Sequence, residues 1–182
     1  MGRWCCPRVV ERIAEWALSA ADDRAIADLL ARCFDTDFGG RSYFHQRHHL
    51  RLLARDQGRI VGHMALMLRS VRLGEDRFEV ACLAEVATDP ARRGQGIASA
   101  LLQAAVVEAQ ASPARHILLF GTARLYEAAG FRKAANPMTF LHLESNQTQA
   151  ILHEAAASLQ VLPLRGVAWE PVAPLDLLGP LF

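Results

Sequence analysis

One stretch of this sequence, Leu83–Leu102 (LAEVATDPARRGQGIASALL), has the pattern of a strand, a turn and a helix. Apolar strand formers lead into Asp89-Pro90, a basic turn with two glycines follows, and an alanine-rich apolar run comes last. The turn falls at the start of the helix, where backbone N–H groups lack partners and the helix dipole favours an anion. Gly94 and Gly96 let the backbone approach that anion because they have no Cβ. The sequence therefore predicts a pyrophosphate-binding loop.

Composition limits the kinds of protein that the chain can be. Its 182 residues are 52% hydrophobic, which is enough for the core of one ordinary domain. The net charge of +1 argues against a broad nucleic-acid surface. Since there is neither an apolar run of spanning length nor a signal-peptide pattern, we expect a cytoplasmic protein without a membrane partner. The cysteines lack zinc spacing and are expected to be free or buried thiols: Cys5, Cys6, Cys33 and Cys82.

Hydrophobic periodicity predicts an ordered series of helices and strands. We expect strands within residues 8–14, 50–53, 60–71, 78–87, 117–120, 139–143 and 161–164, and helices at about 21–34, 97–110, 125–129 and 147–159. Residues 56–59 (DQGR) are a hairpin signal between the strands at 50–53 and 60–71, which with the strand at 78–87 form an antiparallel meander. Ser19 is the predicted N-cap of the first helix, and Gly130 ends the third. The strand–helix–strand order around the glycine turn predicts a parallel pair joined by a right-handed crossover. The expected fold is α+β, a mixed sheet with helices on both faces.

Two motifs resemble those of the GNAT N-acetyltransferases. The acyl-CoA-binding motif of that family, Arg/Gln-x-x-Gly-x-Gly/Ala, is matched by Arg93, Gly96 and Ala98. A second signature, Leu-Tyr-x-x-x-Gly-Phe, is similar to residues 125–131 (LYEAAGF). Both occur in the family's order, and the resemblance covers about residues 8–143. It implies a single GNAT-like domain over residues 1–182, in which residues 144–182 form a C-terminal helix, strand and tail.

The resemblance also implies a donor, a reaction and a set of site residues. Acetyl-CoA would lie between two splayed parallel strands, and its acetyl group would pass to a primary amine. Tyr126 would protonate the departing thiolate. Residues of the strand would pair with the pantetheine arm and polarise the acyl carbonyl: Val86, Ala87 and Thr88. Backbone amides of the turn would hold the pyrophosphate: Arg93, Gly94, Gln95, Gly96, Ile97, Ala98 and Ser99.

The residues themselves suggest further roles in the chemistry. Glu85 is a charged residue inside an apolar strand, so burial would raise its pKa and let it accept the amine's proton, directly or through water. Alternatively, Glu85 points at a loop arginine or at solvent. Tyr126 could also simply pack on the sheet. Arg92 and Arg93 are either solvated charges or, for at least one of them, a phosphate contact.

A histidine-rich segment precedes the meander: His45, His48 and His49. A zinc site is one interpretation, but cysteine or carboxylate partners at ligand spacing are missing, so a substrate-facing loop is favoured and no metal is expected. His63 is predicted to face the acceptor cavity, whereas His116 is predicted to be structural. Trp169 is expected either to cap the core or to line the acceptor site.

Short matches around residues 39–42, 67–75 and the C-terminal tail are similar to Nod-factor N-acyltransferases, and the spacing in 86–102 is similar to aminoglycoside 2′-N-acetyltransferases. Both imply an aminosugar-like acceptor. The sequence leaves two alternatives open, a longer-chain acyltransferase and a non-catalytic CoA-binding module. It is compatible with a monomer or a homodimer.

Overall fold

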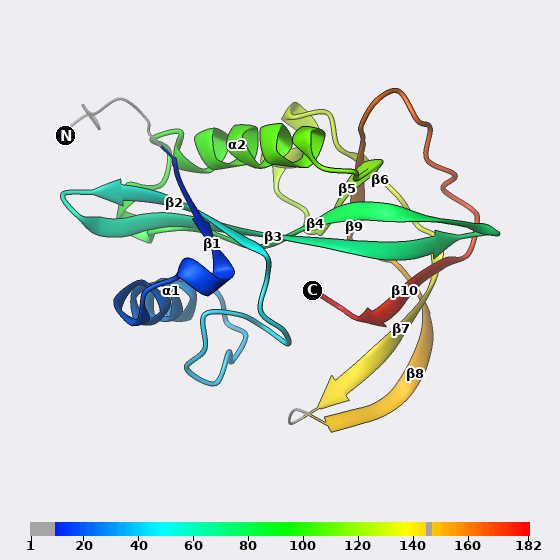
Figure 1. The fold of residues 1–182 in the computed structure, drawn as a ribbon, viewed down its shortest axis with the longest axis horizontal. Helices are drawn as coiled ribbons and strands as arrows, with labels where there is room; N and C mark the ends of the chain where they lie inside the picture. The colour runs from blue at the N-terminus through cyan, green and yellow to red at the C-terminus, as the bar shows by residue number, and fades with distance from the viewer. Residues whose placement is uncertain (1–9, 145–146) are drawn as a thin grey trace. The chain divides into compact units, whose positions relative to one another are not determined.

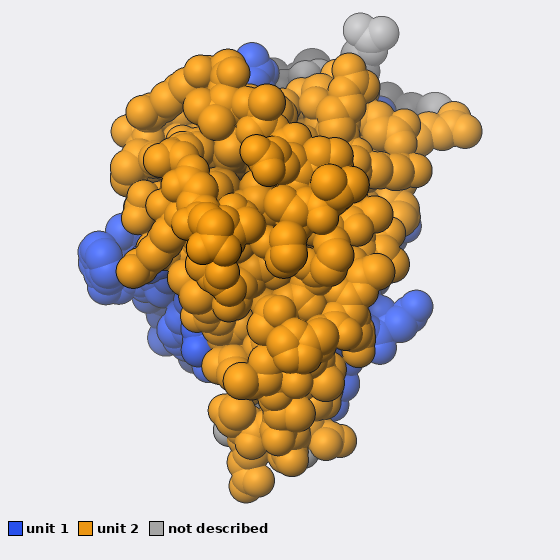
Figure 2. Space-filling view, turned by 90° about the vertical axis from the view of Figure 1, so that its right-hand side faces the viewer, with its two compact units in different colours: residues 1–67, 83–107 blue, residues 68–82, 108–182 orange. Residues whose placement is uncertain are grey.

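The computed structural model describes residues 10–144 and 147–182 (Figure 1). The chain divides into two compact units, residues 1–67 and 83–107 (unit 1) and residues 68–82 and 108–182 (unit 2), which Figure 2 distinguishes by colour. Its elements are β1 (Glu11–Ala14), η1 (Glu15–Ala17), α1 (Ala20–Cys33), β2 (Leu50–Asp56), β3 (Arg59–Leu73), β4 (Asp76–Thr88), η2 (Pro90–Arg92), α2 (Ile97–Ala111), β5 (His116–Phe120), α3 (Arg124–Ala128), β6 (Arg132–Lys133), β7 (Pro137–Glu144), β8 (Gln147–Ala155), β9 (Leu159–Pro163) and β10 (Leu175–Pro180). The predictions for Cys5, Cys6 and the start of the first strand lie outside the described residues.

In unit 1, β1, β2 and β3 form an antiparallel meander. Leu53 of β2 lies opposite Glu11 of β1 and His63 of β3. The β2–β3 hairpin turns at Gln57 and Gly58, whose φ angles of 48° and 81° suit the left-handed turns that two-residue hairpins prefer. The predicted hairpin is therefore confirmed.

Helix α1 begins at its predicted cap and packs on this meander. The Ser19 hydroxyl oxygen accepts a hydrogen bond from the Asp22 N–H at 3.0 Å. Apolar side chains of one helix face then enter a core with residues of three strands. This core contains Ile26, Leu29, Leu30, Leu53, Ile60 and Ala87. Burial of each large apolar side chain stabilises the fold by about 1.5–3 kcal/mol, so α1 is held by packing as well as by its cap.

Helix α2 packs against β3 at Gly62. A Cβ added to Gly62 would lie 2.5 Å from Cγ2 of Ile97 and 2.9 Å from Cδ1 of Leu101, so only glycine fits there. Successive side chains of a strand point to opposite faces. The neighbouring His63 is therefore on the other face, with its register partner Leu53 and helix α1. As predicted, helices cover both faces of this part of the sheet (Figure 1).

The strands pair in the order β6-β9-β5-β4-β3-β10-β7-β8. Strands β4 and β5 are parallel, with Val80 opposite His116, which confirms the predicted parallel pair. Strand β10 is antiparallel to β3 and parallel to β7. The sheet is therefore mixed, as the sequence predicts.

The predicted C-terminal helix at residues 147–159 is wrong. Its first nine residues are strand β8, which pairs antiparallel with β7 from Gln147 opposite Glu144 to Ala155 opposite Pro137. Alanine favours a helix, but helix propensity is weak and the ladder with β7 satisfies this backbone instead. Strand β10, within the tail, is an element that the sequence patterns do not predict.

No helix in the described part of the chain is long and apolar enough to cross a membrane.

Candidate functional site

The glycine loop of unit 1 joins β4 to α2. The Asp89 carboxylate accepts a hydrogen bond from the Ala91 N–H at 3.0 Å, and the Asp89 N–H donates to the Val61 carbonyl at 2.9 Å. Gly94 and Gly96 then adopt φ angles of 75° and 78°, which side-chain-bearing residues rarely take. The chain enters α2 at Ile97, so the loop presents the N-terminal amides of a 15-residue helix.

Two side chains beside this loop have unused hydrogen-bonding capacity. Thr88 Oγ1 and Gln95 Oε1 are buried, and neither finds a hydrogen-bond partner within the described residues. A buried polar atom without a partner is costly unless a ligand or water supplies one. Both residues belong to the set that sequence analysis predicts to bind the donor.

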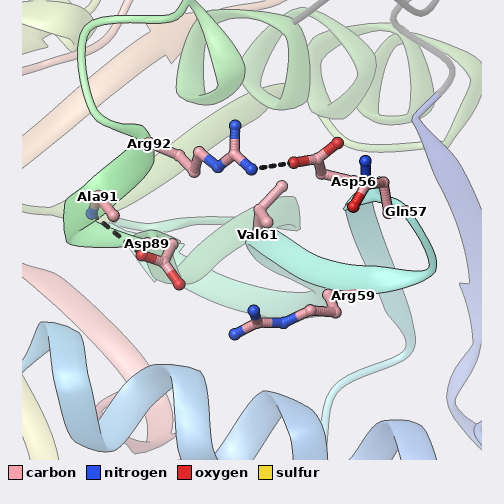
Figure 3. A pocket seen from close by; sticks show the side chains of 7 residues that line it. All are labelled: Asp56, Gln57, Arg59, Val61, Asp89, Ala91 and Arg92. Atoms are coloured by element: carbon pink, nitrogen blue, oxygen red, sulfur yellow. Dashed lines mark hydrogen bonds and ion pairs between the residues drawn. The ribbon is translucent and has the colours of Figure 1, made fainter. Parts of the chain in front are cut away.

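A pocket of about 240 Å³ lies beside the loop, lined by Asp56, Gln57, Arg59, Val61, Asp89, Ala91 and Arg92 (Figure 3). Arg92 and Asp56 point toward one another across it and form an ion pair. The Arg92 guanidinium is therefore already paired with the Asp56 carboxylate. Asp89 also pairs with Arg32 of α1, at 3.3 Å.

Glu85 occupies the most constrained position of the unit. Its φ is 45°, a left-handed value inside strand β4. One carboxylate oxygen accepts a hydrogen bond from the Phe44 N–H at 2.9 Å, and the other lies 2.5 Å from His48 Nε2 and 3.7 Å from an Arg51 nitrogen. The Glu85 carbonyl lies 2.9 Å from His63 Nδ1. This carboxylate therefore points neither at a loop arginine nor at solvent.

Arg51 connects Glu85 to a second buried carboxylate. It is fully buried and donates to both carboxylate oxygens of Glu15, at 2.7 and 3.0 Å. It also donates to the Ser42 carbonyl at 2.8 Å and lies 3.2 Å from His63 Nε2. Buried charges are tolerated when they are paired and hydrogen-bonded, as they are here. We call Glu15, Ser42, Phe44, His48, Arg51, His63 and Glu85 the Glu85 cluster.

The electrostatics of this cluster contradict one prediction. Burial by itself would raise the pKa of Glu85, but His48, His63 and the Phe44 amide stabilise the carboxylate, and the pKa lies below its ordinary value. The predicted raised pKa is therefore wrong. For His63, burial and the neighbouring Arg51 charge lower the pKa to about 4, so its imidazole is neutral at physiological pH.

The histidine-rich segment contributes to this cluster rather than to a metal site. His48 is buried against Glu85. Within the described ranges, no group of three or more histidine, cysteine or carboxylate side chains could hold a metal ion. The interpretation of the histidine-rich segment as a substrate-facing loop stays a prediction, and the side chain of His48 points inward to the Glu85 carboxylate.

Tyr126 lies on α3 in unit 2. Its side chain is almost fully buried and packs edge to face on Phe131, with ring centroids 5.9 Å apart. Burial raises the pKa of its hydroxyl, which stays protonated at neutral pH. Its ring lies so close to Gly121 that an added Cβ would be 3.0 Å from Tyr126 Cε2.

Other residues singled out in unit 2 have structural contacts. Trp169 Nε1 donates to the Asn136 side-chain oxygen at 2.9 Å, and its ring contacts those of Phe78 and His116. These contacts are those of a cap on the core of unit 2. His116 lies 3.1 Å from the Val167 carbonyl, which agrees with its predicted structural role.

Sequence reasoning overlooked Arg51, Glu15 and the inward orientation of His48. One signal was present: Arg51 stands in an apolar run, Leu50–Ala54, just as Glu85 does in its own strand. Two opposite charges in buried strands indicate an ion pair, although no sequence spacing shows that they meet.

Comparisons with known proteins agree with this geometry. The family model described as an acetyltransferase (GNAT) domain matches residues 17–134. Among solved structures, the chain resembles the GNAT acetyltransferase YhbS from Escherichia coli in complex with CoA, at 20% identity and TM-score 0.65, covering 94% of this chain and 91% of that one. It also resembles a Brucella melitensis GNAT acetyltransferase in complex with acetyl-CoA (19% identity, TM-score 0.58, covering 93% of this chain and 96% of that one). A third is the ribosomal-protein-S18-alanine N-acetyltransferase of Escherichia coli (16% identity, TM-score 0.59, covering 88% of this chain and 100% of that one).

Proposed function

Because the chain belongs to the GNAT family of acetyltransferases, we propose that it transfers an acetyl group from acetyl-CoA to a primary amine of a small molecule. The observation that supports this best is the glycine loop. It combines positive φ angles at Gly94 and Gly96 with the amide-bearing start of α2. An anion such as pyrophosphate would accept hydrogen bonds from these amides, which the glycines let it approach closely.

The loop residues fit the donor. The amides of Arg93 to Ser99 would hold the pyrophosphate, and the exposed Arg93 side chain would add charge. Val86, Ala87 and Thr88 would pair with the pantetheine arm, where the buried Thr88 hydroxyl has no other partner among the described residues.

The reaction requires a neutral amine to attack the thioester carbonyl while the thiolate leaves. A backbone N–H of β4 near Val86 would stabilise the negative charge that develops on the carbonyl oxygen. The protonated Tyr126 hydroxyl would give its proton to the departing thiolate. Thiolates leave readily, so positioning of the two substrates accounts for much of the expected acceleration.

Glu85 remains in the proposed catalytic centre, but with a changed role. Its lowered pKa makes it a weaker base than the sequence predicts, and its carboxylate is held by the Phe44 N–H on one oxygen and lies against His48 with the other. The amine must therefore arrive neutral or lose its proton to water. An aminosugar-like acceptor is our specific proposal, based on the short sequence matches.

The test has two stages. Acetyl-CoA and CoA should raise the melting temperature, because a ligand that binds only the folded state stabilises it; the absence of any shift would contradict the proposed donor. Thiol release is then measured across aminosugars, polyamines, amino acids and peptides, with acetyl-CoA and longer acyl-CoAs. A rise in melting temperature without thiol release for any combination of amine and acyl-CoA would indicate a binding module. A preference for long-chain acyl-CoAs would indicate the longer-chain acyltransferase.

Tyr126→Phe tests the proposed acid. With the hydroxyl removed, kcat should fall about 100-fold, at the low end for general acids because the leaving group is good. The KM for acetyl-CoA should change little. Tyr43→Phe is the matched control, since Tyr43 is the other of the two tyrosines in the chain. Full turnover by Tyr126→Phe would show that another group supplies the proton.

A further inference from the structure

Glu85 is held in a backbone conformation that its residue type disfavours. A side-chain-bearing residue with φ of 45° is uncommon, and in the middle of a strand it interrupts the extended backbone. Such conformations persist where the surroundings over-determine them, and they concentrate at functional sites. The contacts of Glu85 should therefore show what the conformation is for.

Two sets of contacts hold Glu85 in place. The side chain is fixed by the Phe44 N–H at 2.9 Å and by His48 at 2.5 Å. The backbone carbonyl is fixed by His63 Nδ1 at 2.9 Å. The second contact is unusual, because a side chain from the neighbouring strand, rather than a ladder amide, meets a strand carbonyl.

Arg51 determines which nitrogen of His63 carries the proton. The guanidinium can only donate hydrogen bonds, so His63 Nε2, 3.2 Å from Arg51 Nη1, must accept. The proton of the neutral imidazole is then on Nδ1, where it is donated to the Glu85 carbonyl. His63 is fully buried, and Arg51 is itself held by Glu15, so this donor is rigid.

The direction of the Glu85 carbonyl fixes the direction of the next amide. No peptide bond in the described chain is cis, and in a planar trans peptide the C=O and the following N–H point in opposite directions. The bond from His63 therefore aims the Val86 N–H away from His63 and from the α1 face of the sheet.

We propose that His63, with its tautomer set by Arg51, is a positioning residue that orients the Glu85–Val86 peptide so that the Val86 N–H donates to the acyl carbonyl of the bound thioester. This inference rests on the proposed function, which requires a β4 amide for that carbonyl. It gives the Glu85 cluster a part in catalysis through backbone geometry.

Two substitutions separate this role from a merely structural one. In His63→Asn the side-chain NH₂ group reaches the place of Nδ1 and can still donate to the Glu85 carbonyl. In His63→Gln the amide reaches the place of Nε2, so it can accept from Arg51 but leaves the carbonyl without its donor. Each of these variants therefore keeps one of the two contacts of His63, the Glu85 carbonyl in His63→Asn and Arg51 in His63→Gln, whereas His63→Leu removes both.

We expect kcat to fall about 30-fold in His63→Gln and His63→Leu, and less than about fivefold in His63→Asn, because a misdirected oxyanion donor costs part of its contribution. The KM for acetyl-CoA should change less than about threefold, since the glycine loop is untouched. For the same reason, the rise in melting temperature caused by CoA should change by less than about 1 °C. Equal kcat values in the Asn and Gln variants would overturn the proposal.

A second readout does not depend on turnover. In ¹⁵N-labelled protein the amide resonance of Val86 should shift in His63→Gln and return toward its original position in His63→Asn. An unmoved resonance in a folded His63→Gln variant would overturn the proposal, even if no acceptor is found. Absence of thiol release by the unsubstituted protein would instead count against the proposed function alone.

Discussion

The glycine loop and the Glu85 cluster both belong to unit 1, but they are built in different ways. The loop, Arg93–Ser99, is a run of consecutive residues whose chemistry comes from backbone amides. The cluster takes its members from η1, β2, β3, β4 and the segment before β2, and its chemistry comes from buried side chains. The loop therefore offers its amides to an anion, whereas the charged side chains of the cluster face one another in the interior of unit 1.

This difference has an energetic consequence. Removing or adding a charge on an exposed loop changes the free energy of unfolding little, because water and salt screen that charge. Buried groups depend on each partner, since removing one leaves the others unpaired in a medium of low dielectric constant. The cluster should respond strongly to protonation, and the loop to changes in backbone conformation.

The largest expected effect is a pH dependence of stability that comes from His63. Its pKa falls from 6.5 to about 4 on folding, so between these values the unfolded chain binds a proton that the folded chain does not. Stability is then fully present above about pH 6.5 and is lost as the pH falls toward 4, by about 3 kcal/mol in total. Chemical denaturation at pH 7 and pH 5 should show about 2 kcal/mol of this loss.

His63→Asn is the control for this measurement, because it removes the titrating group and keeps the donor. Its free energy of unfolding should vary less over the same interval. The pKa values of Glu15 and Glu85 are also lowered on folding, so the protein loses further stability when these carboxylates take up protons. That loss begins below their ordinary pKa of 4.5, outside the interval between pH 7 and pH 5. Parallel pH profiles for the two proteins would contradict the assignment to His63.

The next effect concerns the loop. Gly96→Ala should raise the KM for acetyl-CoA about tenfold, because alanine at φ 78° is strained and the loop relaxes away from its amide arrangement. Gly58→Ala is the matched control: Gly58 has φ 81°, its added Cβ would meet no atom within 4 Å, and it lies in the β2–β3 turn. Both variants should lose similar stability. Equal KM values would show that the glycine serves folding only.

The smallest effect concerns Arg92. Because Arg92 pairs with Asp56 at a partly exposed position, we expect it to steady the loop and contribute little energy by itself. Arg92→Ala and Asp56→Asn should each raise the KM for acetyl-CoA about threefold. A rise confined to Arg92→Ala would indicate instead that its guanidinium binds phosphate directly.

Local patterns predicted much of this molecule because their causes are local. The cap at Ser19, the turn at Gln57-Gly58 and the strand–loop–helix unit around Gly94 and Gly96 each depend on a few adjacent residues. The sequence predicts a helix at residues 147–159, because alanine content is also a local signal, but residues 147–155 form strand β8. Its strand state depends on β7, and the proline-bearing β10 likewise depends on β3 and β7.

From its residues alone, this chain could be placed in a mixed α+β fold with an anion-binding loop, since periodicity, glycine and helix starts carry that information along the chain. The pKa of Glu85, in contrast, depends on the residues that the tertiary structure brings around it. A carboxylate predicted to have a raised pKa has a lowered one, because the segment before β2 and strand β3 bring His48, His63 and the Phe44 N–H around it. Burial and pairing act in opposite directions on the same group, and only the arrangement in space establishes which is larger.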